Sequence, residues 1–286
     1  MEAIRYLLDN NALSYLFGHS NVPEATLQNV RKRLLKKKTA DPDCVIGGVN
    51  LLEELAGIAI SNPTQFKQIM TFVPALFNGR TLEPWYDRMY QEVETGKPVP
   101  PAEAFLNASD ESLVLDEWRR RRDVSPRVMD RKLDYKNGSD EARAGVFGRI
   151  QPGKSSNQPV KGSKKVAEEW FSEFHERKQS WFQDRWAIMR RNRNLSDDPQ
   201  FCPAVNTLPV SHAWVTYNLT KMYQIHGLGR GNDKGDLYDL AHFIDGCNAD
   251  YLVTDDKGFR EICDLAKWRP FQHITFQEFC EKVLKN

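Results

Sequence analysis

The sequence predicts an α/β fold in which helices cover a mostly parallel β-sheet, with a mainly helical insertion in the middle of the chain. Short apolar runs alternate with helical patterns near both ends of the chain. This alternation is typical of parallel strands, because the connection between two of them crosses over the sheet, usually as a helix. The middle of the chain lacks the alternation and contains mainly helical patterns.

The amino-terminal region predicts the first two strands. Residues 4–8 (IRYLL) and 44–49 (CVIGGV) are short apolar runs, as expected for buried strands. Leucines recur at helical spacing directly after the second run. We expect helices at residues 12–17, 24–38, 50–60 and 64–77.

The carboxy-terminal region contains the clearest alternation. Its order is helix, strand, helix, strand, helix, which predicts a second half of the same sheet. The expected elements are residues 236–247, 250–253, 259–267 and 273–276, followed by a helix from residue 277.

Residues 98–206 do not fit this pattern, and we interpret them as an insertion into a core formed by residues 1–97 and 207–286. One long helix is expected from 165 to 193, and its aromatic residues predict a small hydrophobic core within the insertion. Residues 143–165 contain six basic and no acidic side chains, together with several glycines and prolines. This composition predicts a flexible basic segment.

The whole-chain composition narrows the class of protein. The chain has 40 basic and 39 acidic side chains, so a nucleic-acid contact would require a local positive patch. Its five scattered cysteines form no CxxC pair, which favours a reducing compartment over a disulfide framework or a zinc ribbon. The amino terminus lacks the pattern of a secretion signal, and no apolar stretch approaches the roughly 18 residues of a membrane span. We therefore expect a cytoplasmic protein without a membrane partner.

Acidic residues follow or flank the predicted strands. Asp9 comes directly after the first strand, and Asp255 and Asp256 follow the strand at 250–253. Because parallel strands end at the same edge of a sheet, acids from distant parts of the chain are expected to converge there. Neighbouring carboxylates repel one another, and Mg²⁺ or Mn²⁺ removes that repulsion by binding their oxygens. The pattern therefore predicts a divalent metal site.

Four blocks of the sequence together resemble the PIN-domain family, the fold of VapC-type toxins and of several RNA-processing nucleases. The blocks are LLDNNALSYL, VNLLEELAG, DLYDLAHFIDGCNADYLVTDDKGF and HITFQEFCEKVL. In the first block, Asp9 takes the position of the family's first acid and Asn11 that of its amide. Asn10 stands where the family usually has a hydroxyl residue, which is a departure from the pattern.

The second and third blocks leave two choices open. Glu54 precedes a leucine as the family's glutamate does, whereas Glu53 fits a variant of the same motif. Asp239 aligns with the third acid, and Asp236 lies one helical turn earlier as its rival. Thr254 and Asp256 match the family's Thr-x-Asp motif, which Phe259 closes.

The resemblance implies a three-layer fold and a Mg²⁺- or Mn²⁺-dependent endoribonuclease that hydrolyses RNA with a metal-activated water. The residues implied to bind the metal and catalyse the reaction are Asp9, Glu54, Asp239 and Asp256, and those implied to support them are Asn11, Thr254 and Asp236. A toxin or defence role, a protein inhibitor and a homodimer also follow from the resemblance. The alternatives are a structure-specific DNA nuclease and an inactive PIN-like protein that only binds RNA.

Two basic runs are candidates for contacts with RNA phosphates, although each is equally compatible with a solvated helix face. A further residue, His242, lies three positions after Asp239 on the same helical face. It could reach the metal site, but a histidine in such a position is more commonly a packed core residue. The residues of the basic runs are Arg31, Lys32, Arg33, Arg119, Arg120, Arg121 and Arg122.

Overall fold

The computed structural model describes residues 4–18, 20–36, 44–120, 163–228, 230 and 236–285. Its centre is a five-stranded sheet with the strand order β3-β2-β1-β4-β5, in which all neighbouring strands are parallel. This confirms the predicted α/β class and parallel sheet, and it adds one strand, β3, that the sequence did not predict. The strands are β1 (Arg5–Leu8), β2 (Cys44–Gly48), β3 (Thr81–Leu82), β4 (Tyr251–Val253) and β5 (Gln272–Ile274).

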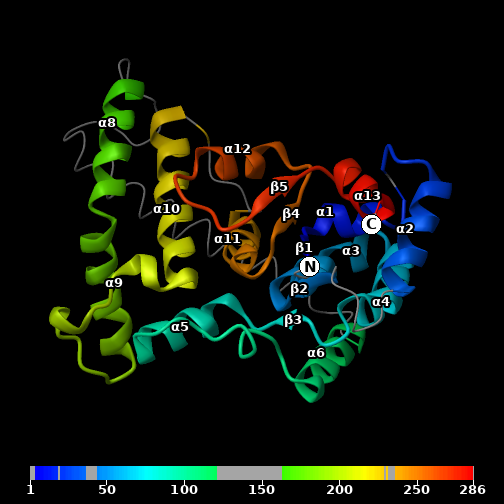
Figure 1. The fold of residues 1–286 in the computed structure, drawn as a ribbon, viewed down its shortest axis with the longest axis horizontal. Helices are drawn as coiled ribbons and strands as arrows, with labels where there is room; N and C mark the ends of the chain where they lie inside the picture. The colour runs from blue at the N-terminus through cyan, green and yellow to red at the C-terminus, as the bar shows by residue number, and fades with distance from the viewer. Residues whose placement is uncertain are drawn as a thin grey trace.

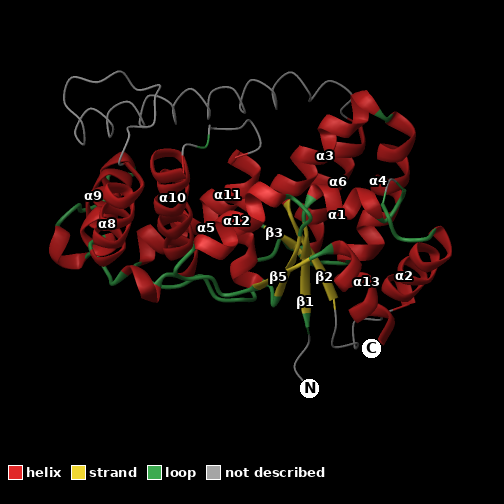
Figure 2. Ribbon diagram, turned by 90° about the horizontal axis from the view of Figure 1, so that it is seen from above, coloured by secondary structure: helices red, strands yellow, loops and turns green. Residues whose placement is uncertain are grey.

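Helices cover both faces of the sheet and give the molecule three layers (Figures 1 and 2). One layer contains α1 (Asn10–Tyr15), α2 (Glu24–Lys36), α3 (Val49–Ser61), α4 (Pro63–Phe77), α6 (Ala108–Arg120) and α13 (Phe276–Lys285). The other contains α5 (Trp85–Thr95), α10 (Pro209–Leu228), α11 (Asp236–Asp245) and α12 (Lys257–Leu265), with α8 (Ser163–Glu176) and α9 (Lys178–Asn192) packed outside them.

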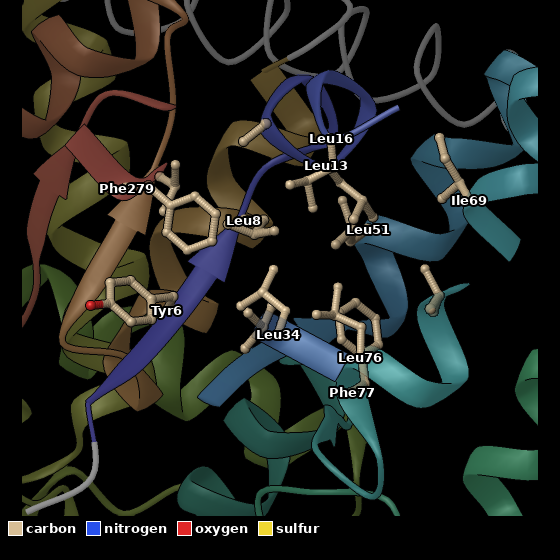
Figure 3. Packing of buried hydrophobic residues seen from close by; sticks show 14 of the residues in the cluster. Tyr6, Leu8, Leu13, Leu16, Leu34, Leu51, Ile69, Leu76, Phe77 and Phe279 are labelled. Atoms are coloured by element: carbon tan, nitrogen blue, oxygen red, sulfur yellow. The ribbon is translucent and has the colours of Figure 1, made fainter. Parts of the chain in front are cut away.

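The side chains of β1 divide between the two cores, because successive residues of a strand point to opposite faces of the sheet. Tyr6 and Leu8 pack with Leu13 of α1 and Phe279 of α13 in the first core (Figure 3). Leu7 points to the other face and packs in a second core with residues of α10, α11 and α12. Burial of one such leucine stabilises the fold by about 1.5–3 kcal/mol, so the central strand is anchored from both sides.

The long helix expected from 165 to 193 is two helices. The chain turns at Arg177, between α8 and α9, and this turn lets each helix pack against a different neighbour. Phe182 and Trp186 are buried with side chains of α5 and α10, including Val93 and Val215. The expectation that the aromatic residues form a core within the insertion is therefore wrong for these two rings, which pack against helices of the predicted core.

Helix α6 joins residues of the predicted insertion to the layer of α3 and α4. The Glu111 carboxylate accepts hydrogen bonds from the Gly79 amide at 2.7 Å and the Thr81 hydroxyl at 2.5 Å. The domain boundaries stay a prediction, since residues 121–162, with most of the predicted flexible basic segment, lie outside the described residues. Within the described ranges, no helix is both long enough and apolar enough to cross a bilayer.

Candidate active site

The strand order reverses between β1 and β4, which are neighbours in the sheet although far apart in the sequence. The chain moves outward from β1 through β2 to β3, whereas β4 and β5 lie on the other side of β1. In open α/β sheets, the crevice beyond the carboxyl ends of strands at such a reversal is the usual ligand site. Asp9 lies there, directly after β1, and its amide donates to the Val253 carbonyl of β4 at 3.1 Å.

A cavity of about 910 Å³ opens at this edge of the sheet. The structure brings together the four acids that the sequence singled out, from four separate segments of the chain. It also places Glu54, rather than Glu53, on the cavity wall. The lining residues include Asp9, Asn10, Asn11, Glu54, Asp236, Asp239, His242, Asp256 and Glu261.

Asp9 is a buried carboxylate held in place by the first helix. It is the residue before α1, and its Oδ1 accepts a hydrogen bond from the Ala12 amide at 2.6 Å. The side chain is only 5% exposed, and this burial raises the pKa of Asp9 to about 6, although hydrogen bonds from Thr254 and Ala12 oppose the rise. Thr254 therefore lies beside Asp9, and its role in a metal site stays a prediction.

Asp239 and Asp256 also line the cavity. Asp256 caps α12, and its Oδ1 accepts from the Phe259 amide at 2.7 Å. The pKa of Asp239 is raised well above its usual value, first by burial and then by the charges of Asp256, Glu54 and Asp236. The carboxylates therefore repel one another, a condition that a bound cation relieves.

His242 pairs with Glu54. Its Nε2 lies 3.1 Å from Oε2 of Glu54, and the imidazole is only 2% exposed. Burial alone would lower the pKa of His242, but the hydrogen bond and charge of Glu54, with the charge of Asp9, outweigh it and raise this pKa to about 9. The histidine is thus a positively charged neighbour of the acids, a role that the sequence did not predict.

Asp236 is held by a lysine. Oδ1 of Asp236 lies 2.6 Å from Nζ of Lys221 on α10, and its backbone carbonyl accepts from the Tyr217 hydroxyl at 3.0 Å. Asp239, one turn later, is surrounded mainly by other carboxylates. This difference makes Asp239 the better candidate for a metal ligand and Asp236 the residue that positions Lys221.

Helix α10 supplies cavity residues that the sequence did not reveal. Lys221 and Gln224 lie three positions apart on α10, and Arg230 follows the helix. Glu261 of α12 accepts from Gln224 at 3.0 Å and pairs with Arg230 at 2.6 Å. Two cations, Lys221 and Arg230, therefore line the cavity together with the acids. The sequence pattern did not point to these residues, because α10 buries polar as well as apolar side chains on several sides.

The chemistry of this donor set suits Mg²⁺ or Mn²⁺, since hard cations prefer carboxylate oxygens. The arrangement is not a preformed metal cage. Among the described side chains, no three His, Cys, Asp or Glu groups are placed so that they could hold a metal ion. Asp9 and Asp256 cap helices, and Glu54 is paired with His242. To bind a metal ion, these carboxylates would have to accept the ion as an additional partner or give up a present hydrogen bond.

The amino-terminal basic run is partly committed to the fold. The Arg31 guanidinium donates to the Leu16 carbonyl and pairs with Glu24, and Arg33 donates to the Leu284 carbonyl. Lys32 between them is exposed. The side chains of Arg119, Arg120, Arg121 and Arg122 lie outside the described residues.

Comparison of the chain with models of protein families, with curated proteins and with solved structures gives no match. The resemblance to PIN domains therefore stays a prediction. The chemistry of the cavity is what a functional hypothesis must rest on.

Proposed function

We propose that this protein is a divalent-metal-dependent nuclease, with RNA as the expected substrate and the cavity beside β1 and β4 as its active site. One observation carries the proposal. Carboxylates from four distant segments, Asp9, Glu54, Asp239 and Asp256, line a single cavity at the point where the strand order reverses. Repulsion among these carboxylates destabilises the site unless a cation binds there, so their convergence indicates a functional site.

In this proposal, the four carboxylates would hold Mg²⁺ or Mn²⁺. When bound, the ion would supply a water of lowered pKa as the nucleophile and would neutralise charge on the phosphodiester. His242 would keep the Glu54 carboxylate in one orientation, because its Nε2 hydrogen-bonds one oxygen of that group. The burial of Asp9 would limit competition from bulk water.

Lys221 and Arg230 would bind the substrate. Lys221 is held by Asp236, and Arg230 by Glu261. Both line the same cavity as the metal-facing acids, so a phosphate group could contact them while the adjacent diester bond lies near the carboxylates. The proposal thus assigns substrate contacts to α10 and the segment after it.

Four further parts of the proposal rest on the resemblance alone. They are a PIN-like fold, a toxin or defence role, a protein inhibitor and a homodimer. A structure-specific DNA nuclease is the nearest alternative activity. Comparison of single-stranded RNA with flapped DNA as substrates distinguishes the two.

An inactive RNA-binding protein is the second candidate, and a specific observation favours it. Oδ1 of Asp9 and Oδ1 of Asp256 accept helix-cap hydrogen bonds, and no ready ligand trio exists among the described residues. A Mn²⁺ titration followed by calorimetry separates this candidate from the nuclease. Binding of the ion by the wild-type protein, but not by Asp9→Asn, argues for the nuclease.

The direct test is cleavage of a mixed set of labelled RNAs and DNAs in Mn²⁺, in Mg²⁺ and in EDTA. We expect cleavage of RNA only with metal, and a loss of at least a hundredfold in Asp9→Asn. Asp184→Asn is the matched control, because Asp184 is exposed on α9 and does not line the cavity. Equal cleavage by Asp9→Asn and the wild type would show that the assigned site is wrong.

A further inference from the structure

A second group of basic side chains lies where α8, α9, α10 and the segment after α12 meet; α8 and α10 run side by side in Figure 1. We call Lys178, His175, His212 and Lys267 the Lys178 cluster. Nζ of Lys178 lies 2.9 Å from Nε2 of His212. His175 is close enough to Lys178 and Lys267 for both charges to affect its pKa. Three helices and a loop supply these groups, so the fold brings them together.

The two lysines of the Lys178 cluster have no carboxylate partner among the described side chains. The acid Glu168, two turns before His175 on α8, is engaged with the Tyr223 hydroxyl at 3.5 Å. An anion could therefore enter without displacing a resident carboxylate.

The two histidines are neutral at pH 7. Burial, followed by the charges of Lys178 and Lys267, lowers the pKa of His175 to about 4. Burial also lowers the pKa of His212 to about 4, with contributions from Lys178 and His175. A neutral imidazole still offers one N–H donor, so His175 can donate to an oxyanion, whereas Nε2 of His212 accepts from the Lys178 ammonium.

One nitrogen of the cluster has no partner. Nε2 of His175 is shielded from solvent and forms no hydrogen bond with any described group. A buried polar atom without a partner costs about 1–3 kcal/mol. An oxyanion that accepts from His175 and from the lysines would remove this cost.

Aromatic rings hold the cluster in shape. The His212 ring stacks on Trp268 with centroids 3.9 Å apart, and the His175 ring meets Phe171 edge-on at 4.5 Å. Phe171 in turn stacks on Tyr223 at 4.5 Å. Such packing fixes the imidazoles before a ligand arrives, which lowers the entropic cost of binding.

The cluster adjoins the acidic cavity through α10. Leu228 packs against the Phe171 and Tyr223 rings and also lines the cavity. His212 lies 12 residues before the cavity residue Gln224, which corresponds to about 18 Å along the helix. A nucleic-acid strand that leaves the cavity along α10 could therefore pass the cluster.

We propose that the Lys178 cluster binds a phosphate group, and that this group belongs to the backbone of a nucleic-acid strand extending from the acidic cavity. The assignment to nucleic acid rests on the proposed function. The binding of a phosphate group does not, because it depends only on the cluster's own donors and charge.

The first experiment titrates inorganic phosphate into full-length protein with labelled histidine rings, in EDTA, with chloride at equal ionic strength as the control. The chain has six histidines, so single substitutions assign their signals. We expect saturable shifts of His175 and His212 in the wild type and equally in Asp9→Asn. The double variant Lys178→Gln/Lys267→Gln should bind at least tenfold more weakly. Shifts that do not saturate, or that survive in this variant, would overturn the proposal.

The control variant Lys97→Gln/Lys165→Gln removes two exposed lysines outside the cluster and should bind phosphate like the wild type. Circular dichroism shows whether each variant folds. Lys267 is exposed, so Lys267→Gln alone replaces the double variant if the latter unfolds. We then expect about threefold weaker phosphate binding, and unchanged binding would contradict the proposal.

The second experiment measures binding of a labelled single-stranded RNA in EDTA at several salt concentrations. A backbone phosphate in the cluster predicts about tenfold weaker binding by Lys178→Gln/Lys267→Gln and a log–log salt slope smaller by about 0.7, the contribution of one phosphate of a single strand. Unchanged RNA affinity, together with phosphate binding, would overturn the nucleic-acid assignment and leave a small phosphorylated ligand. Neither readout requires cleavage, so failure of the nuclease proposal can be told apart from failure of this one.

Discussion

Nε2 of His242 lies 3.1 Å from Oε2 of Glu54, and this contact joins α11 to α3 at the wall of the acidic cavity. The contact fixes one oxygen of a carboxylate that the proposed reaction needs. Replacement of a residue that orients a metal ligand typically lowers metal affinity or activity by roughly 10- to 100-fold. His242 is therefore a positioning residue in the proposed mechanism.

Replacement of His242 by phenylalanine should weaken Mn²⁺ binding and cleavage by roughly 10- to 100-fold, because Glu54 loses its hydrogen-bond donor. The conservative variant His242→Gln keeps a donor and should recover part of both. Calorimetric titration with Mn²⁺ and cleavage assays measure the two effects. If His242→Phe binds Mn²⁺ as tightly as the wild type, the contact has only a structural role.

Asp9→Asn should stabilise the metal-free protein at neutral pH. Burial raises the pKa of Asp9 in the folded state to about 6, above the ordinary 3.8. The folded state thus holds this proton more tightly than the unfolded state, so stability falls as the pH rises from about 4 to about 6. At pH 7.5 the buried charge of Asp9 costs the wild type at most about 3 kcal/mol of stability. Asp9→Asn gains less than this cost, because His242 loses a favourable negative neighbour.

Urea denaturation in EDTA measures this effect at pH 7.5 and at pH 4. Asparagine caps helices as well as aspartate does, so the cap on α1 should survive the substitution. The advantage of Asp9→Asn should be present at pH 7.5 and nearly absent at pH 4. A variant that is less stable than the wild type at pH 7.5 contradicts the assigned burial cost.

Mn²⁺ should offset most of this difference in stability. A ligand at a hundred times its dissociation constant stabilises the folded state by about 2.7 kcal/mol. We expect the melting temperature of the wild type to rise by several degrees in Mn²⁺ and to return in EDTA, whereas that of Asp9→Asn should hardly change. Equal shifts in both proteins would place the ion elsewhere.

The convergence of the acids could be predicted from the sequence because it follows from topology. Once β1 and β4 are recognised as parallel strands, the residues that follow them, Asp9 and Asp256, must lie at one edge of the sheet. The choice between Glu53 and Glu54 could not be predicted. Adjacent helical residues point about 100° apart, and which of them faces a cavity depends on how α3 is rotated against the sheet.

The contribution of α10 was not predictable for a different reason. Sequence patterns reveal a helix when apolar residues form one stripe, but α10 is buried on several sides and carries buried polar residues such as Thr216 and Gln224. Lys221 therefore had no visible connection with the acids. The break between α8 and α9 was also missed, because the turn at Arg177 is stabilised by packing against α10 and α5 rather than by a glycine or proline.

The buried pair of Arg88 and Asp245 provides a test of the fold that does not depend on function. Both side chains are 0% exposed, and a Cβ on Gly48 of β2 would overlap Oδ2 of Asp245. Burial raises the pKa of Asp245, and Arg88 opposes the rise. Asp245→Ala would leave the guanidinium buried without its partner, at a cost of about 3–5 kcal/mol.

The double variant Arg88→Met/Asp245→Ala should cost less than the sum of Arg88→Met and Asp245→Ala, because it removes both charges together. Urea denaturation of the two single variants and the double variant measures the coupling. Asp197→Ala is the matched control, since Asp197 pairs with Arg191 on the surface, where solvent screens the interaction and its loss should change stability little. If Asp245→Ala unfolds no more easily than this control, the pair does not anchor α5 to α11. The close approach of β2 and α11 at Gly48 would then need another explanation.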